Sequence, residues 1–257
     1  MVSYVYWCLF KWGVTKELIG SEQLAAMQTV PGLRFEKSQA KESEPREPVA
    51  WAEVEKIFDL VSPVVADMLR VQWHTGCRPQ QVCTIRPCEV DTARDPWTWT
   101  PGRHKGTFRG HVLTIFLGPT ARRVLEPYLD RAGDSFCFSP REAKIAQLKS
   151  KGWKVKSVMA KFGLRYKADT YQKAVLNGIA GLGKPRIKAP FNREKFATAG
   201  LVYWTPHQIR HSKGTEIREQ YGIEAAQAML GHASLSATQI YAKKRMELAR
   251  EIAEKTG

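Results

Sequence analysis

The clearest structural signal in this chain is the sequence TPHQIRHSKGTEIREQYGIEAAQAMLGHASLSATQIY at residues 205–241. Thr205 followed three residues later by Gln208 is the pattern of a helix N-terminal capping box, and proline occupies the first helical position. A glycine can end a helix in the left-handed conformation, so Gly222 and Gly231 are expected to end two successive helices. The predicted helices cover residues 205–221, 223–230 and, further along, 236–254.

The rest of the chain predicts further short helices and a single β-hairpin. Ser62 can cap a helix that has proline at its first position, and Gly76 can end that helix. Residues 97–100 and 111–117 are typical of strands, and the Gly- and Lys-containing turn 102–110 joins them. The predicted fold class is therefore mainly α with a small antiparallel β-sheet, an α+β fold. The other expected helices cover residues 1–34, 50–61, 62–74, 79–85, 120–131, a segment that begins at 139, and 169–179.

The domain organisation follows from a polar segment near the N-terminus. Residues 38–48, SQAKESEPREP, have no apolar periodicity and contain two prolines, which is typical of an interdomain linker. The residues before it are too few to bury a core of their own. We therefore expect the end of a small helical domain whose beginning is absent. The predicted organisation is residues 1–37 as this partial helical domain, 38–49 as the linker and 50–257 as the main domain.

The composition excludes several classes of protein. The chain has 257 residues, of which 43% are hydrophobic and 25% are charged, as in an ordinary soluble globular protein. Its longest apolar run is far shorter than the roughly 18 residues that a membrane span needs. The apolar residues 1–10 lack the basic region and the cleavage site of a secretory signal. Five cysteines form no CxxC pair, so reduced, partly buried thiols in a cytoplasmic protein are expected.

The net charge indicates an anionic partner. Forty Lys and Arg residues against 25 Asp and Glu residues leave a formal charge of +15, and the pI is about 9.7, as in many nucleic-acid-binding proteins. Residues 141–195 concentrate this excess, with 15 basic residues against three acidic ones. Because Lys and Arg displace counterions condensed on a phosphate backbone, the segment predicts nucleic-acid binding. A charge run that only aids solubility, or a disordered insertion, is the alternative. The candidate DNA-binding residues are Lys149, Lys151, Lys154, Lys156, Lys161, Arg165, Lys167, Lys184, Arg186 and Lys188.

Residues 207–211, HQIRH, contain the first candidate catalytic pair. His207 and Arg210 lie three residues apart on the predicted helix, so both project from one face near its N-terminus. The exposed amide groups and the dipole of a helix start favour an anion. An arginine can bind two phosphate oxygens with its planar guanidinium, and the imidazole adds a donor. The pair predicts phosphate binding, and a solvated helix face is the alternative.

Three further segments contain candidate catalytic residues. The sequence LGH at residues 230–232 is followed, nine residues after its histidine, by Tyr241. Tyrosine is a weak nucleophile at neutral pH because its pKa is about 10, and it needs cations around the anion that it attacks. Arg78 follows the Thr-Gly pair at the end of a predicted helix, and Lys105 lies on the hairpin turn. Taken singly, Tyr241 fits an ordinary core tyrosine, and Arg78 and Lys105 each fit an ordinary surface charge.

Together, the candidates resemble the tyrosine recombinase (phage integrase) family in residue type, order and spacing. The resemblance covers roughly residues 50–250, with weaker similarity over residues 1–37. It rests on an arginine after a Thr-Gly turn, a hairpin lysine, His-x-x-Arg, a histidine in Leu-Gly-His, and a tyrosine. The corresponding residues here are Arg78, Lys105, His207, Arg210, His232 and Tyr241.

The resemblance implies a site-specific DNA recombinase, such as the integrase of a mobile element. Tyr241 would attack a DNA phosphodiester and leave a 3′-phosphotyrosyl link and a free 5′-hydroxyl. The two arginines and the two histidines would stabilise the transition state. Lys105 would protonate the leaving 5′-oxygen. No cofactor is expected, since neither a metal ion nor ATP would be required.

The resemblance also implies partners. The partners are double-stranded DNA and three further copies of the chain in a tetramer on DNA. The resemblance also implies that the protein is located in the nucleoid of the cytoplasm. The predicted C-terminal helix, residues 242–254, would dock on a neighbouring subunit or pack on its own domain.

The chain departs from the family where an acid usually stands three positions after the first arginine, because Gln81 occupies that position here. A further departure is the incomplete N-terminal domain. Two other interpretations remain open: a type IB topoisomerase-like strand relaxer, and a truncated DNA-binding remnant that does not cleave.

Overall fold

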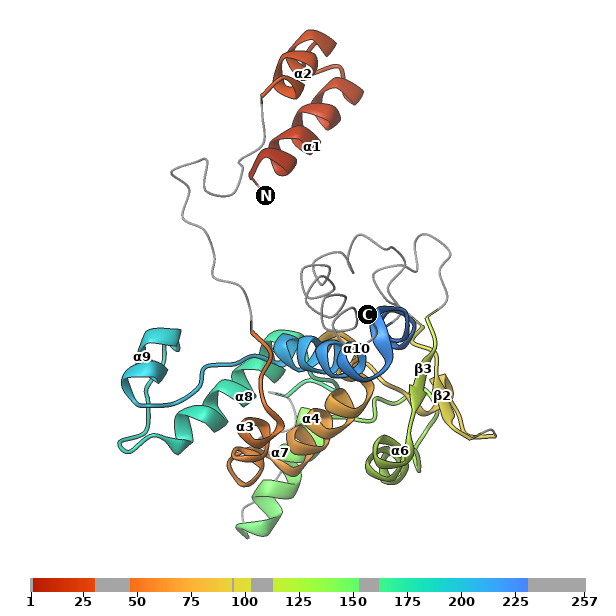
Figure 1. Cartoon of the computed structure of the whole chain (residues 1–257), viewed down its shortest axis with the longest axis vertical. Helices are drawn as coiled ribbons and strands as arrows, with labels where there is room; N and C mark the ends of the chain where they lie inside the picture. Colours follow the sequence, from red (N-terminus) through yellow and green to blue (C-terminus); the bar gives the residue numbers. More distant parts are fainter. Residues whose placement is uncertain (1, 31–46, 94, 103–112, 153–161, 231–257) are drawn as a thin grey trace, which may run out of the picture. The chain divides into compact units, whose positions relative to one another are not determined.

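The computed structural model describes residues 2–30, 47–93, 95–102, 113–152 and 162–230 (Figure 1). The chain divides into two units, Met1–Arg46 and Glu47–Gly257. The first unit contains α1 (Val2–Thr15) and α2 (Ser21–Gln28). Large apolar side chains of this pair, such as Leu9 and Trp12, are exposed. The predicted boundaries at residues 37 and 49 stay a prediction, because most of the predicted linker lies outside the described residues.

The second unit is built around one apolar helix, α4 (Pro63–Thr75). Met68, Leu69 and Val71 are fully buried on it, and α6, α10, α7 and α8 pack against it. Figure 1 shows α4 between these helices. The other helices are α3 (Trp51–Glu55), α5 (Pro79–Val82), α6 (Pro119–Leu125), α7 (Pro140–Ser150), α8 (Ala168–Leu182), α9 (Arg193–Thr198) and α10 (Pro206–Leu230), with 3₁₀ turns η1 (Phe58–Leu60), η2 (Pro87–Glu89) and η4 (Glu126–Tyr128).

A small antiparallel sheet lies beside these helices, in the order β1-β2-β3. Its strands are β1 (Val90–Asp91), β2 (Trp97–Trp99) and β3 (Ile115–Leu117). The two tryptophans of β2 point into the core because alternate residues of a strand share one face. The predicted hairpin is confirmed by the pairing of β2 with β3. Strand β1 was not predicted, and the fold class, mainly α with a small antiparallel sheet, is confirmed.

Local hydrogen bonds explain where several helices begin and end differently from the prediction. The helix expected over residues 79–85 ends at Val82, because the Thr84 hydroxyl donates to the carbonyls of Gln80 and Gln81. The helix expected over residues 120–131 ends as α6 at Leu125 and continues as η4 around a proline, which lacks a backbone N–H. The helix expected over residues 50–61 is divided into α3 and η1. Helix α9 was missed, although Asn192 caps it through the backbone N–H of Lys195.

Helix α10 begins and bends where the sequence predicted. The Thr205 N–H donates to Gln208 Oε1 at 3.0 Å, which is one half of the capping box. Gly222 has φ 87° and ψ 175°, so α10 is two helices joined at this glycine. The helix predicted over residues 236–254 lies outside the described residues.

The cysteines and the lengths of the helices bear on the predicted class of the protein. All five cysteines are free thiols; Cys77, Cys83 and Cys137 are buried, and Cys8 and Cys88 are exposed. No helix in the described ranges combines the length and the apolar character that crossing a membrane requires.

Candidate functional site

Two segments far apart in the sequence form the centre of the candidate site. The first is the turn 75–78 between α4 and α5, and the second is the start of α10, which packs against α4. Arg78 is the N-cap residue of α5 and is half-buried, Arg210 is half-buried on α10, and His207 is exposed on the first turn of α10. The other three predicted catalytic residues, Lys105, His232 and Tyr241, lie outside the described residues.

Arg210 links the two segments directly. Its Nη1 donates to the Gly76 carbonyl at 2.8 Å, across 134 positions of sequence. Its Nη2 donates to the Leu230 carbonyl, also at 2.8 Å. Gly76 stands two residues before Arg78, and Leu230 stands two residues before His232. One guanidinium therefore holds the backbone next to two other predicted catalytic residues.

A buried glutamine, Gln72 on α4, makes a second link. Its Nε2 donates to the Cys77 carbonyl at 3.2 Å and to the Pro206 carbonyl at 2.8 Å. Its Oε1 accepts a hydrogen bond from the Tyr171 hydroxyl at 3.0 Å. These carbonyls directly precede Arg78 and His207 in the chain. Sequence reasoning missed Gln72; the available signal was a polar residue on the buried face of an apolar helix, which must be hydrogen-bonded there.

Gln81, which stands where the family usually has an acid, has a defined local role. Its Oε1 accepts a hydrogen bond from the Arg78 backbone N–H at 2.6 Å, which satisfies one of the N–H groups left unpaired at a helix start. Its Nε2 is buried and has no hydrogen-bond partner among the described residues. Gln81 thus orients the backbone of Arg78, as a carboxylate at the same position could.

Burial shapes the electrostatics around Arg78. Desolvation by burial lowers the pKa of Arg78 from its ordinary value. Burial also raises the pKa of the Cys77 thiol to about 11, so this thiol stays protonated at neutral pH and supplies no negative charge. Among the described residues, Arg78 forms no ion pair. A partly desolvated cation of this kind gains free energy when an anion binds beside it.

The turn at Gly76 leaves no room for a side chain. Gly76 has φ +64°, and a Cβ placed there would lie 2.7 Å from Leu230 Cδ2 and 3.2 Å from Lys213 Cγ. Leu230 is itself buried. A left-handed residue without a Cβ is therefore needed for the turn to accept both Arg210 and Leu230.

We expect Gly76→Ala to destabilise the protein by more than Gly200→Ala. Gly200 has φ +66° with nothing within 4 Å, so its substitution carries only the left-handed strain of about 1–2 kcal/mol. Gly76→Ala carries that strain and also displaces Leu230. Urea unfolding of both variants measures the difference. Equal losses of unfolding free energy would contradict the close packing of Leu230 on the turn.

Ten residues were predicted to bind DNA, and those of them that the structure describes do not form one cluster. Lys149 and Lys151 lie at the end of α7, Arg165 and Lys167 precede α8, and three more follow α8. Helix α8 has 15 residues, so its two ends are roughly 22 Å apart. Arg165 is half-buried, and the other described members of this set are exposed. The three residues after α8 are Lys184, Arg186 and Lys188, and those outside the described residues are Lys154, Lys156 and Lys161.

One segment of the chain is similar to known proteins. Residues 186–247 match the phage integrase family. The tyrosine recombinase XerA of Thermococcus kodakarensis is 48% identical over 63 residues, which cover 24% of this chain and 22% of that protein. The tyrosine recombinase XerC of Escherichia coli O1:K1 / APEC is 41% identical over 69 residues, covering 24% of this chain and 23% of that protein. The matched part thus spans less than a quarter of the length of these relatives.

Solved structures show the same fold. A lambda integrase (75-356) dimer bound to a COC' core site superposes with a TM-score of 0.56 at 14% identity, covering 93% of this chain and 71% of that chain. The crystal structure of XerA recombinase gives a TM-score of 0.50 at 17% identity, covering 93% and 78%. The segment matched to the family contains His207, Arg210, His232 and Tyr241. Residues 186–247 therefore match the phage integrase family, and the chain has the fold of the lambda integrase and XerA recombinase structures.

Proposed function

We propose that this chain cleaves and rejoins double-stranded DNA as a site-specific tyrosine recombinase. The observation that carries the proposal is the pair of hydrogen bonds from Arg210 to the Gly76 and Leu230 carbonyls. They join the turn of Arg78 to the end of α10, from which the chain continues to His232 and Tyr241. Cationic groups converging on one place suit a phosphate that gains negative charge during the reaction.

The residues divide the reaction between them. The Tyr241 hydroxyl loses its proton, with His207 as the acceptor, and its oxygen forms a bond to the phosphorus. The bond from phosphorus to the 5′-oxygen breaks, and Lys105 supplies a proton to that leaving oxygen. The guanidinium groups of Arg78 and Arg210 bind the non-bridging oxygens, together with His232.

Rejoining is the reverse chemistry with a different strand. A 5′-hydroxyl of the partner strand attacks the phosphotyrosine and gives its proton to Lys105, and the tyrosine oxygen leaves and regains its proton from His207. The number of phosphodiester bonds is unchanged by the two steps. The protein itself supplies every group that these steps need. Gln72 and Arg210 prepare the site by fixing the backbone around Arg78 and His207 before DNA binds.

The proposal includes an assembly and a place in the cell. We propose that four copies act together on DNA, with residues 242–254 of one copy docking on the next. We further propose that residues 1–37 form part of a DNA-clamping helical domain, connected by residues 38–49 to the catalytic domain of residues 50–257. The basic groups before and after α8 would contact the DNA backbone, so the protein would reside on the nucleoid in the cytoplasm.

A covalent-trapping experiment tests this function. The purified chain is incubated in EDTA with a library of nicked duplexes, in which cleavage releases a short fragment that carries the free 5′-hydroxyl and diffuses away. We expect a protein–DNA adduct that survives denaturing electrophoresis, is enriched for particular sequences, and maps to Tyr241 by mass spectrometry. Stable DNA binding without any adduct would instead identify a non-cleaving remnant. Relaxation of supercoiled DNA by the monomer without a preferred site would identify a topoisomerase.

A further inference from the structure

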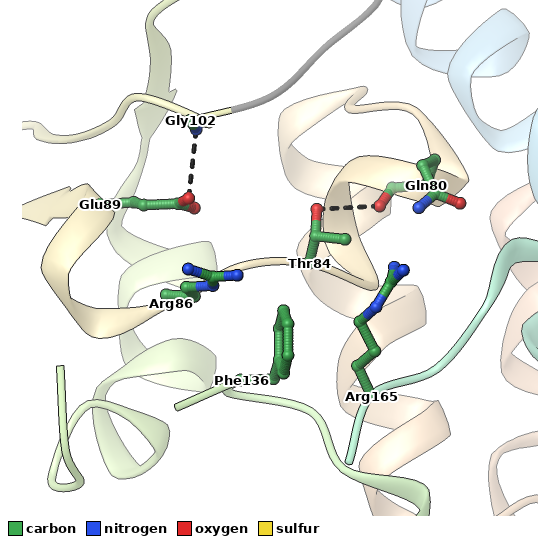
Figure 2. Close-up of a pocket in the computed structure, with 7 residues that line it drawn as sticks. All are labelled: Gln80, Thr84, Arg86, Glu89, Gly102, Phe136 and Arg165. Carbon is green, nitrogen blue, oxygen red and sulfur yellow. Dashed lines mark hydrogen bonds between the residues drawn. The ribbon is translucent and has the colours of Figure 1, made fainter. Parts of the chain in front are cut away.

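A basic pocket lies beside α5 and contains none of the six proposed catalytic residues, although one of its residues, Arg165, belongs to the predicted DNA-binding set. It has a volume of about 500 Å³. Figure 2 shows Arg86 and Arg165 on either side of the Phe136 ring, with Gln80 and Glu89 at the edge of the same space. Together with Gly102, these residues come from four separate segments of the chain, so the pocket exists only in the folded protein.

The aromatic ring holds both arginines. The Arg86 guanidinium carbon lies 4.7 Å from the centre of the Phe136 ring, and that of Arg165 lies 5.7 Å from it. Phe136 is itself fixed, because its carbonyl accepts a hydrogen bond from Arg131 at 2.9 Å. Such cation–π contacts orient a guanidinium while leaving its N–H groups able to bind an anion.

The acidic residue of the pocket already has hydrogen-bond donors. Glu89 Oε1 accepts from the Gly102 N–H at 3.1 Å, and its Oε2 accepts from Trp99 Nε1 at 3.2 Å. Among the described residues, neither Arg86 nor Arg165 forms an ion pair. Arg86 Nε is buried without a hydrogen-bond partner there, and leaving a buried donor of a charged group unpaired is costly. The pocket therefore presents two oriented cations.

We infer that this pocket binds a second phosphate of the DNA backbone, distinct from the one that is cleaved. Its place in the chain supports this, since Gln80 stands two residues after Arg78, and Gly102 stands three residues before Lys105. A phosphate held here would fix the DNA next to both of these proposed catalytic residues. The inference rests on the proposed function, because DNA is the phosphate source that this function supplies.

The salt dependence of DNA binding tests the inference. Each phosphate contact contributes about 0.9 to the slope of log K against log salt concentration. We expect Arg86→Gln and Arg165→Gln each to reduce that slope by about this amount, on duplexes of any sequence. Arg122→Gln is the matched control, since Arg122 also lies over an aromatic ring, Trp97 at 4.6 Å, but outside this pocket. It should leave the slope as in the wild type.

Three further measurements separate the outcomes. Thermal unfolding of each variant confirms that the fold is retained, and Arg165→Gln carries the test where Arg86→Gln is unstable. Slopes unchanged from the wild type in folded Arg86 and Arg165 variants would overturn the inference. Stabilisation of the wild type by inorganic phosphate or a mononucleotide, with unchanged DNA slopes, would assign the pocket to free phosphates and also overturn it. A chain that shows the altered slopes but forms no covalent adduct would refute the proposed function alone.

Discussion

Tyr241→Phe is expected to abolish the covalent protein–DNA adduct while leaving DNA affinity within about twofold of the wild type. The substitution removes only the phenol oxygen, which forms the bond to phosphorus, and keeps the aromatic ring. Loss of the nucleophile removes the reaction path entirely, so the adduct should fall below detection on a denaturing gel.

A matched control is available in the same part of the chain. Tyr221 lies on α10 and is 73% exposed, so Tyr221→Phe should leave adduct formation as in the wild type. Gel-shift titration of both variants on the same duplex shows that binding is retained. An adduct that persists in Tyr241→Phe would refute the assignment of the nucleophile, and its site would then have to be mapped afresh.

Arg210→Lys is expected to slow single-turnover cleavage by about 10²–10³-fold, nearly as much as Arg210→Gln. Loss of one donor to a developing oxyanion typically costs this much. Lysine keeps the positive charge, but its single ammonium group cannot reproduce the planar fork that reaches the Gly76 and Leu230 carbonyls together. Both variants should also unfold at a lower temperature than the wild type, because two buried carbonyls lose their donors.

Arg218→Gln serves as the control for the loss of charge, since Arg218 lies on the same helix eight residues later. It should retain the wild-type cleavage rate and change DNA affinity only modestly. A wild-type rate for Arg210→Lys would show that charge alone is needed at this position. In that case the two backbone hydrogen bonds would have a structural role without a catalytic one.

The sequence was informative wherever the interaction is local. The capping pairs at Ser62 and Thr205 involve residues three apart, and both are present in the structure. Gly76 and Gly222 have the positive φ that their places at helix ends predicted. Strand β1 was missed because it has only two residues, and its pairing with β2 depends on a partner that single-strand propensity does not contain.

The sequence predicts residue types and an order for the candidate site, and it does not predict the contacts that support the described part of the site. The ten basic residues illustrate the limit, since a shared stretch of sequence placed them together but α8 separates their described members. Gln72 illustrates the opposite case, because nothing in its neighbourhood in sequence indicates that it joins Cys77, Pro206 and Tyr171. Burial and long-range packing decide such contacts.

From its sequence alone, this chain could be identified as a mainly helical, basic protein with an ordered series of residues suited to phosphoryl transfer, because these features depend on spacing and composition along the chain. Only the folded molecule placed the Arg210 guanidinium against the Gly76 carbonyl and set Arg86 and Arg165 around Phe136. The physical reason is that hydrogen bonds and cation–π contacts act over a few ångströms in space. Residues more than a hundred positions apart come within that range only when the core around α4 has packed.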